Sequence, residues 1–294
     1  MNRAYWSEPT FKQLTNIITG PAGLAAFDFD HTLIQGDQGE ALMNYIVLSG
    51  KACGDQEWFW QNWPEIAISK QDSLKKQFDA FTHYNDPLLL AQLTDDLIDV
   101  YELIRNQHGN EAAYRWSSIF FAGLTESEIG DLSIQVFERE LNQDISSIVL
   151  PSGRELPTGL RIRSKMKELV ADLLNRGWQV FIVTASPQIP ISVLSHHWNL
   201  PKSNVLGMTL QTDNQGRLTS KIVEPYPCAE GKVKALRQVT QAPLLLAAGD
   251  SMMDLPLLEE ANSALVFDRG SLVLCNRAQE KGWMIEPSKV TIES

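Results

Sequence analysis

The chain has 294 residues, of which 44% are hydrophobic and 21% charged, an ordinary balance for one large or two modest globular domains. This composition excludes a disordered tail protein, a collagen and a small disulfide scaffold. The 25 Lys and Arg against 36 Asp and Glu leave a net charge of −11, which argues against a nucleic-acid or anionic-membrane partner. If the ligand is itself an anion, positive charge must be supplied locally.

The three cysteines, Cys53, Cys228 and Cys275, are widely spaced and form no C-x-x-C motif. That pattern argues against both a disulfide framework and a zinc site. No stretch approaches the ~18 apolar residues of a membrane-spanning helix. The mildly apolar segment 17–27 is broken by Gly20 and Pro21 and lacks a preceding basic region, so it does not resemble a signal peptide. We therefore expect a cytoplasmic protein without a membrane partner.

The first part of the chain predicts one helix and one buried strand. Residues 1–20 are amphipathic and end at the Gly20-Pro21 breaker. The run from Leu24 to Phe27 is apolar and ends abruptly at Asp28. A short apolar run of this kind is typical of a buried parallel strand whose carboxyl end carries function.

From about Asp37 to Thr158 the apolar residues follow a helical periodicity, and runs of β-branched residues are few. Apolar residues recur at helical spacing in 41–48 and in 87–105. Prolines and glycines between Pro151 and Gly159 then end the region. We predict an all-helical module here.

After Gly159 helices and strands alternate. Amphipathic or helix-forming segments are expected at 162–174, 190–198, 231–240, 254–260 and 271–282, buried strands at 180–184, 244–250 and 264–267, and a β-hairpin in 205–224. Such alternation predicts a doubly wound, Rossmann-like parallel sheet. The α/β core would comprise 1–36 and 160–294, and the helical cap domain 37–159. Because the insertion leaves from the carboxyl end of the first strand, where ligands bind in open α/β sheets, we expect it to act as a lid.

Acidic and hydroxyl side chains gather at the predicted strand ends. Asp28 and Asp30 follow the first strand, Thr184 ends another, and Asp250 and Asp254 follow a third. Clustered carboxylates repel one another unless a cation lies among them, and an all-oxygen ligand set suits Mg²⁺. A single D-x-D could merely be a turn, but the coincidence of these ends predicts a magnesium and phosphate site.

These segments resemble the four motifs of the haloacid dehalogenase-like hydrolase superfamily. Asp28-Phe29-Asp30-His31-Thr32-Leu33 is similar to the first motif, D-x-D-x-T-L/V, and Thr184 to the Ser/Thr of the second. Lys232 matches the third-motif lysine, and Gly249-Asp250-Ser251-x-x-Asp254 the fourth motif, G-D-S/T-x-x-D. The insertion point also matches the helical cap of this superfamily.

The resemblance implies a role for each matching residue. Asp28 would be the nucleophile that forms an aspartyl-phosphate, and Asp30 the general acid and then the general base. Asp28, the backbone carbonyl of Asp30, Asp250 and Asp254 would hold Mg²⁺, with Asp254 acting directly or through an intermediate. Thr184 and Lys232 would bind the phosphoryl oxygens, so Lys232 and Mg²⁺ would supply the local positive charge.

Asp30 favours phosphate ester hydrolysis over dehalogenation, because a halide leaving group needs no proton and an alkoxide does. A large helical cap further favours a small-molecule phosphate ester as substrate. We therefore expect a Mg²⁺-dependent phosphatase. The alternatives are a catalytically inactive phosphate-binding module and a phosphotransferase of the same fold. The presence of both Asp28 and Asp30 argues against the inactive module.

Two branches of the superfamily suggest different leaving groups. In a phosphoserine phosphatase-like reading, Asp37, nine residues after Asp28, would contact the substrate's ammonium group. In a phosphorylcholine phosphatase-like reading, Glu40 would face a quaternary ammonium. Asp37-x-x-Glu40 is equally typical of a helix start. Trp58, Trp60, Trp63 and Trp116 could contribute to a cation–π cage, although tryptophans at such spacings more often belong to a core.

Overall fold

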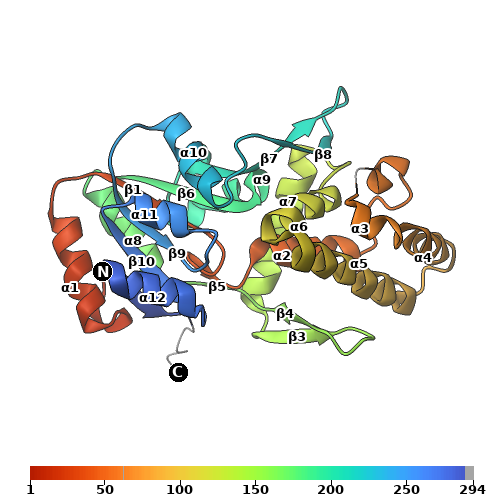
Figure 1. Cartoon of the computed structure of the whole chain (residues 1–294), viewed down its shortest axis with the longest axis horizontal. Helices are drawn as coiled ribbons and strands as arrows, with labels where there is room; N and C mark the ends of the chain where they lie inside the picture. The colour runs from red at the N-terminus through yellow and green to blue at the C-terminus, as the bar shows by residue number, and fades with distance from the viewer. Residues whose placement is uncertain (62, 289–294) are drawn as a thin grey trace. The chain divides into compact units, whose positions relative to one another are not determined.

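The computed structural model describes residues 1–61 and 63–288, which form two compact units (Figure 1). The α/β unit comprises residues 1–38, 160–209 and the chain from Glu224 onward. The helical unit comprises 39–159 and 210–223. This division differs from the sequence-based one at 210–223, which we had placed in the core. That segment bonds to the helical unit, since Gly123 N–H donates to Leu218 O at 2.8 Å, a pairing that no local pattern reveals.

The α/β unit is built on a seven-stranded sheet in the order β11-β10-β9-β1-β6-β7-β8, of which β8 and the end of β7 belong to the helical unit. Pairings from β11 through to β7 are parallel, which confirms the predicted doubly wound architecture. The strands are β1 (Leu24–Phe27), β6 (Gln179–Pro187), β7 (Val205–Thr212), β8 (Leu218–Val223), β9 (Leu244–Gly249), β10 (Ser263–Asp268) and β11 (Met284–Pro287). Strand β11 was not predicted, and β7–β8 is the predicted hairpin.

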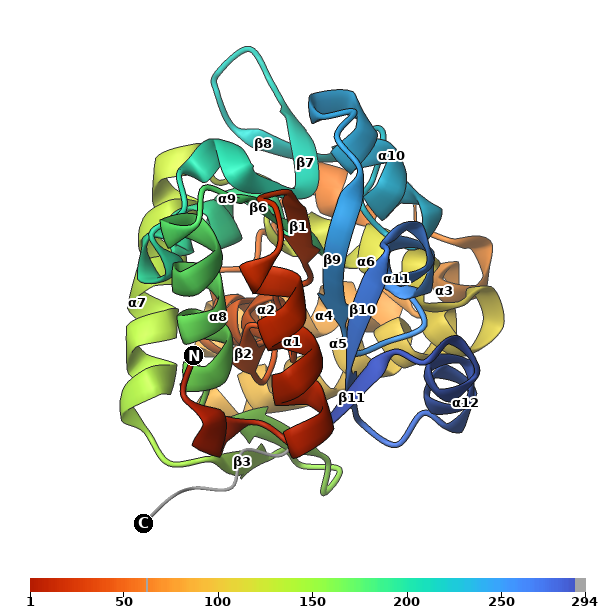
Figure 2. The same cartoon turned by 90° about the vertical axis from the view of Figure 1, so that its left-hand side faces the viewer.

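Helices cover both faces of this sheet (Figure 2). Leu236, Leu257 and Leu274 of α10, α11 and α12 pack on one face, and α1 and α8 lie on the other. The helices and 3₁₀ turns of the unit are η1 (Arg3–Tyr5), α1 (Glu8–Thr19), α8 (Ser164–Asn175), α9 (Gln188–Ser192), η4 (Ser195–Trp198), η5 (Lys202–Asn204), α10 (Glu230–Val239), α11 (Leu255–Glu260) and α12 (Leu272–Lys281). The single helix expected at 190–198 is therefore wrong, because the segment divides into α9 and η4.

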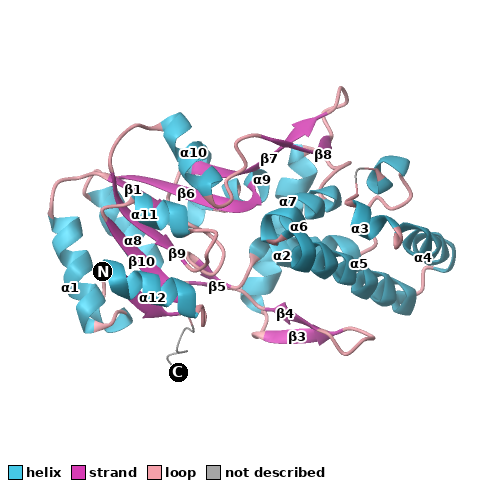
Figure 3. Cartoon of the chain, in the orientation of Figure 1, coloured by secondary structure: helices cyan, strands magenta, loops and turns pink. Residues whose placement is uncertain are grey.

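The helical unit carries six α-helices among its described residues (Figure 3). They are α2 (Gln38–Leu48), α3 (Glu65–Ile68), α4 (Gln71–Tyr84), α5 (Pro87–His108), α6 (Asn110–Ser117) and α7 (Glu126–Asn142), joined by the 3₁₀ turns η2 (Glu57–Trp60) and η3 (Ser118–Phe120). Local signals define their ends. Helix α5 begins with the Asp86 cap and Pro87, and α7 with a capping box between Thr125 and Glu128.

The expectation of an all-helical insertion is wrong at its end, where β3 (Ser146–Val149) pairs antiparallel with β4 (Glu155–Thr158). Of the prolines and glycines expected to end the module, Pro151 and Gly153 lie in the turn of this hairpin, with Gly153 at φ 86°, whereas Pro157 lies within β4. Strand β3 is mostly exposed, so it lacks the buried alternation by which strands are recognised in sequence.

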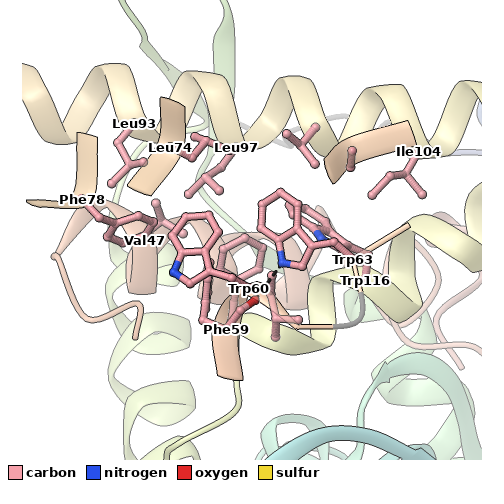
Figure 4. Close-up of a cluster of buried hydrophobic side chains, with 14 of the residues drawn as sticks. Val47, Phe59, Trp60, Trp63, Leu74, Phe78, Leu93, Leu97, Ile104 and Trp116 are labelled. Carbon is pink, nitrogen blue, oxygen red and sulfur yellow. Dashed lines mark hydrogen bonds between the residues drawn. The ribbon is translucent and has the colours of Figure 1, made fainter. Parts of the chain in front are cut away.

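Aromatic residues form the core of the helical unit (Figure 4). The indoles of Trp60 and Trp63 stack with 5.3 Å between ring centroids, and Trp116 meets Trp63 edge-on at 5.2 Å. Trp63 Nε1 donates to Phe59 O at 2.7 Å. All three tryptophans are buried, which confirms the interpretation as core for them, while Trp58 packs partly buried against the same cluster.

The two connections between the units are paired with each other. Strands β2 (Ile34–Gln35) and β5 (Arg161–Ile162) form a short antiparallel ladder next to the points where the chain leaves and re-enters the α/β unit. This pairing, which local sequence patterns do not reveal, holds together two segments separated by the whole insertion. Within 1–61 and 63–288, none of the helices combines the length and apolarity required to cross a lipid bilayer.

Candidate active site

Strand register brings the predicted motifs to one edge of the sheet. Phe27, the last residue of β1, pairs with Ile182 of β6 on one side and with Ala248 of β9 on the other. The residues that follow these positions therefore emerge side by side at the carboxyl edge. Those residues are Asp28, Thr184 and Asp250, with Asp254 at the start of α11. Ligands bind at this edge in open α/β sheets.

The loop after β1 is folded tightly by its own backbone. Asp28 N–H donates to Ala248 O at 2.9 Å, and Leu33 N–H returns to Phe29 O at 2.8 Å. His31 takes a left-handed conformation, with φ 59°. The buried guanidinium of Arg163 donates to His31 O through Nε and Nη2. These contacts hold the backbone that carries Asp28 and Asp30 in one conformation.

Lys232 joins two of the acidic residues. Its Nζ donates to Asp28 Oδ1 at 2.6 Å and to Asp254 Oδ1 at 2.5 Å. Burial disfavours the ammonium, but the Asp254 and Asp28 carboxylates raise the pKa of Lys232 above its usual value. The lysine is therefore a fixed positive charge beside Asp28. Lys234, two residues further along α10, is exposed.

Two glycines allow this close packing. A Cβ at Gly231 would lie 1.7 Å from Tyr226 O, so no other residue fits beside Lys232 without moving the backbone. A Cβ at Gly249 would lie 2.5 Å from Asp254 Cβ. The glycines of the third and fourth motifs are thus required by the approach of the chain to itself at the site.

Asp28, Asp250 and Asp254 are buried and each offers an oxygen within 4.8 Å of the others. Thr32 Oγ1 lies 3.2 Å from Asp28 Oδ2 and 3.4 Å from Asp250 Oδ1, so these two oxygens converge. Lys232 and Arg269 form ion pairs with these three carboxylates. An all-oxygen ligand set fits a hard divalent cation such as Mg²⁺.

The oxygens of Asp254 are already engaged. Oδ1 accepts from Lys232, and Oδ2 accepts from Asp250 N–H, Ser251 N–H and Ser251 Oγ. Burial raises the pKa of this carboxyl, but Lys232 and the backbone donors lower it more, so that the net pKa is below the usual value. Asp254 therefore organises the fourth motif and orients Lys232.

Asp250 has a second cationic neighbour. Arg269, the residue after β10, donates from Nη1 to Asp250 Oδ2 at 2.8 Å. Burial raises the pKa of Asp250 to about 6, with Asp254 adding to the rise and Arg269 opposing it. Because Arg269 holds Oδ2, Oδ1 is left on the side of Thr32 and Asp28.

Asp30 is held apart from the three-carboxylate cluster. Its Oδ1 accepts from Gln38 N–H at 2.7 Å and its Oδ2 from Ser186 Oγ at 2.6 Å. Burial raises the pKa of Asp30 well above its usual value, and the nearby Asp37 and Asp28 charges raise it further. A raised pKa favours the protonated form of the carboxyl group, which is the form that a general acid needs.

The remaining predicted residues occupy different parts of the molecule. Thr184 is buried in β6, and its Oγ1 accepts from Ser186 N–H at 3.0 Å. Asp37 directly precedes α2 and lies close enough to Asp30 to affect its pKa. Glu40 is exposed in the first turn of α2 and belongs to the helical unit. The predicted helix start at Asp37-x-x-Glu40 is therefore confirmed.

Sequence reasoning assigned no role to Ser186, Thr32 or Arg269, which contact Asp30, Asp28 and Asp250. Thr32 lies within the first motif and Ser186 lies two residues after Thr184 of the second, so their positions were a usable signal. Arg269 had a weaker one, as a cation immediately after a predicted strand. Its partner depends on the adjacency of β10 and β9, which is a tertiary property.

Comparison with known proteins identifies the family to which the chain belongs. The sequence profile of the haloacid dehalogenase-like hydrolases matches residues 67–259, about two thirds of the chain. The chain therefore belongs to the haloacid dehalogenase-like hydrolases. The match includes Thr184, Lys232, Asp250 and Asp254, and the first motif lies before it.

Solved structures share the fold at low sequence identity. A conserved protein of unknown function from Anaerococcus prevotii is 17% identical, with a TM-score of 0.72 over 95% of this chain and 92% of that one. A protein of unknown function from Bordetella pertussis is 19% identical, with a TM-score of 0.63 over 92% and 100%. A probable phosphoserine phosphatase from Vibrio cholerae is 15% identical, with a TM-score of 0.52 over 92% and 62%. None of the curated proteins matches the sequence significantly.

Proposed function

We propose that this hydrolase is a Mg²⁺-dependent phosphatase that cleaves a small-molecule phosphate monoester through an aspartyl-phosphate on Asp28. The observation that carries the proposal is the convergence of Asp28, Asp250 and the buried ammonium of Lys232 at one sheet edge, with a second carboxyl, Asp30, held nearby. The Lys232 ammonium would attract the anionic phosphoryl group to the Asp28 carboxylate, which would otherwise repel it.

In the proposed first step, a carboxylate oxygen of Asp28 attacks phosphorus and the bond to the leaving alcohol breaks. Asp30 gives its proton to the departing oxygen, so the alcohol leaves neutral. Lys232 and Thr184 hold the phosphoryl oxygens in place. A bound Mg²⁺ would neutralise charge on the phosphoryl group, held by Asp28, Asp250 and the backbone carbonyl of Asp30. Asp254 would act on this cation indirectly, because both of its oxygens already accept hydrogen bonds.

In the second step, Asp30 accepts a proton from water as the water oxygen attacks phosphorus. The bond between phosphorus and Asp28 breaks, and inorganic phosphate is released with both aspartates restored. Balanced over the cycle, one phosphate ester and one water give one alcohol and one phosphate. The double role of Asp30 requires a group that is stable both with and without its proton.

The substrate class we propose is a phosphate ester whose alcohol carries an amine or quaternary ammonium. The support is the acidic surroundings of Asp30, where Asp37 places another carboxylate near the group that meets the leaving alcohol. A cage made of Trp60, Trp63 and Trp116 is not part of this proposal, because these indoles are buried in the core of the helical unit. Recognition would therefore depend mainly on carboxylates, with Asp37 and Glu40 as the candidates.

The direct test is phosphate release in the presence of Mg²⁺ from O-phosphoserine, phosphorylcholine, phosphoethanolamine and a neutral sugar phosphate. We expect turnover of at least one cationic ester, reversible loss on chelation with EDTA, and loss in Asp28→Asn, which keeps the volume and removes the charge. Product analysis with an added alcohol acceptor separates hydrolysis from phosphoryl transfer. Full activity of Asp28→Asn or of the chelated protein would exclude the mechanism.

A further inference from the structure

The carboxyl group of Asp30 is held by two donors of different chemical kinds. Oδ1 accepts from the backbone N–H of Gln38 at 2.7 Å, and Oδ2 accepts from the hydroxyl of Ser186 at 2.6 Å. Asp30 itself is only 8% exposed. Each carboxylate oxygen therefore accepts one hydrogen bond when the group is ionised, and protonation of either oxygen makes that oxygen a weaker acceptor.

The two donors respond differently to a proton on Asp30. A backbone amide can only donate, so a proton on Oδ1 would weaken the hydrogen bond from Gln38 N–H, and Gln38 N–H could not compensate by accepting. A hydroxyl can donate or accept, and it turns about a single bond. Ser186 can therefore accept from a protonated Oδ2, or turn aside, without any movement of the backbone. The proton of the neutral acid belongs on Oδ2 for this reason.

Ser186 also contacts the predicted phosphate-binding residue. Its backbone N–H donates to Thr184 Oγ1 at 3.0 Å, while its side chain reaches Asp30. Because Thr184 Oγ1 accepts from this amide, its own proton is directed elsewhere. One residue at the end of β6 thus orients both the hydroxyl expected to meet the phosphoryl group and the carboxyl expected to meet the leaving alcohol.

We propose that Ser186 is a positioning residue that selects Oδ2 of Asp30 as the proton-carrying oxygen and stabilises the carboxylate left after proton transfer. The inference rests on the proposed phosphatase function and names a residue beyond the superfamily motifs. When Oδ2–H gives its proton to the leaving alkoxide, the alcohol departs and Oδ2 becomes anionic. The Ser186 hydroxyl then donates to that same oxygen, in the geometry seen here. In the second step the order is reversed, as Oδ2 takes a proton from the attacking water.

The test compares leaving groups that differ in their need for a proton. For Ser186→Ala we expect kcat/KM to fall about 10- to 100-fold on the best alkyl phosphate of the four esters above, the effect of losing one hydrogen bond to a charged group. On p-nitrophenyl phosphate, whose leaving group is stable as an anion, the fall should stay below about threefold. Ser186→Thr keeps the hydroxyl and should recover most of the alkyl activity. Ser192→Ala is the matched control, because the hydroxyl of this half-buried serine donates to Ile189 O within its own helix, α9.

A double variant tests whether the effect of Ser186 on the reaction depends on Asp30. Asp30→Asn alone should impair alkyl esters far more than p-nitrophenyl phosphate, by about 10²- to 10⁴-fold. Adding Ser186→Ala to Asp30→Asn should then cost little more, since the proton is already absent. Equal losses of Ser186→Ala on both leaving groups, or losses that multiply in the double variant, would overturn the role of Ser186 while leaving an active phosphatase. If the wild-type protein releases phosphate from none of the esters, the proposed function fails and the inference fails with it.

Discussion

Lys232 Nζ lies 2.5 Å from Asp254 Oδ1, and both side chains are almost completely buried. Asp254 also accepts three hydrogen bonds from Asp250 and Ser251 through its other oxygen. The carboxylate therefore links the lysine of the third motif to the loop of the fourth. A buried ion pair is destabilising to break, although here Lys232 would keep Asp28 as its other carboxylate partner.

For Asp254→Asn we expect loss of both stability and activity. The amide cannot neutralise Lys232, and if its oxygen stays with the backbone donors, its NH₂ faces the ammonium. Lys232 keeps Asp28 as its partner, so the loss is that of one hydrogen bond to a charged group, and the free energy of unfolding should fall by about 2 kcal/mol. Urea unfolding measures this, and phosphate release should fall in parallel. Glu260→Gln, which removes a partly exposed carboxylate bonded to Arg237, is the control. An Asp254→Asn protein of unchanged stability would contradict the linking role.

Arg269 offers a prediction about metal affinity. Its guanidinium holds Asp250 Oδ2, and a second cation bound to Oδ1 would be repelled by this charge. Because Arg269 is 44% exposed, solvent screens much of the repulsion. We expect Arg269→Ala to bind Mg²⁺ about three- to tenfold more tightly, a change of ~1 kcal/mol, as measured by titration calorimetry. The control is Arg277→Ala, which removes a partly exposed arginine paired with Glu259. Weaker binding by Arg269→Ala would instead mean that the arginine mainly orients Asp250.

Variants of Asp37 and Glu40 distinguish the phosphoserine-like from the phosphorylcholine-like hypothesis for the leaving group. Asp37 lies near Asp30, so Asp37→Asn should raise KM for cationic phosphate esters by about fivefold, the value of a charge interaction near 1 kcal/mol. KM for a neutral sugar phosphate should change little. Glu40→Gln is the paired variant, and an effect there alone would favour the phosphorylcholine-like reading. If neither variant changes KM for any cationic ester, recognition of a cation at this position is excluded.

Glu286 gives a prediction for stability as a function of pH. Burial raises its pKa, but Lys165 at 2.8 Å and Ser7 lower it more, so the folded-state pKa lies below the ordinary value of 4.5. The stabilisation is thus complete above pH 4.5 and is lost as pH falls through the folded-state pKa. Glu286→Gln should be less stable than wild type by about 3 kcal/mol at pH 7.

The difference between wild type and Glu286→Gln should shrink as the pH is lowered from 4.5 towards 3. Urea unfolding at pH 7, 5 and 3.5 measures it. Glu280→Gln, at an exposed carboxylate on α12, should show almost no difference at any pH. If the difference in free energy of unfolding between wild type and Glu286→Gln is constant with pH, shape and packing, rather than charge, determine the role of this residue.

The sequence by itself determined the α/β class, most element positions and the residues of the four motifs. Runs such as 24–27 and 244–249 are apolar throughout because parallel strands are covered on both faces, so they can be recognised without tertiary information. Acidic residues at the ends of such runs predicted a common site, because the carboxyl ends of parallel strands meet at one edge of the sheet. The helix start after Asp37 could likewise be predicted, since Asp37-x-x-Glu40 is a local pattern.

Only the tertiary structure decided which side chains are partners. The hydrogen bond from Ser186 to Asp30 and the contact of Arg269 with Asp250 depend on strand order and register, which join residues 156 and 19 positions apart. The exposed β3–β4 hairpin, the edge strand β11 and the pairing of 210–223 with the helical unit carry little local hydrophobic signal. Periodicity identifies the face of an element that is buried, whereas the identity of its neighbour depends on contacts between segments that are distant in the chain.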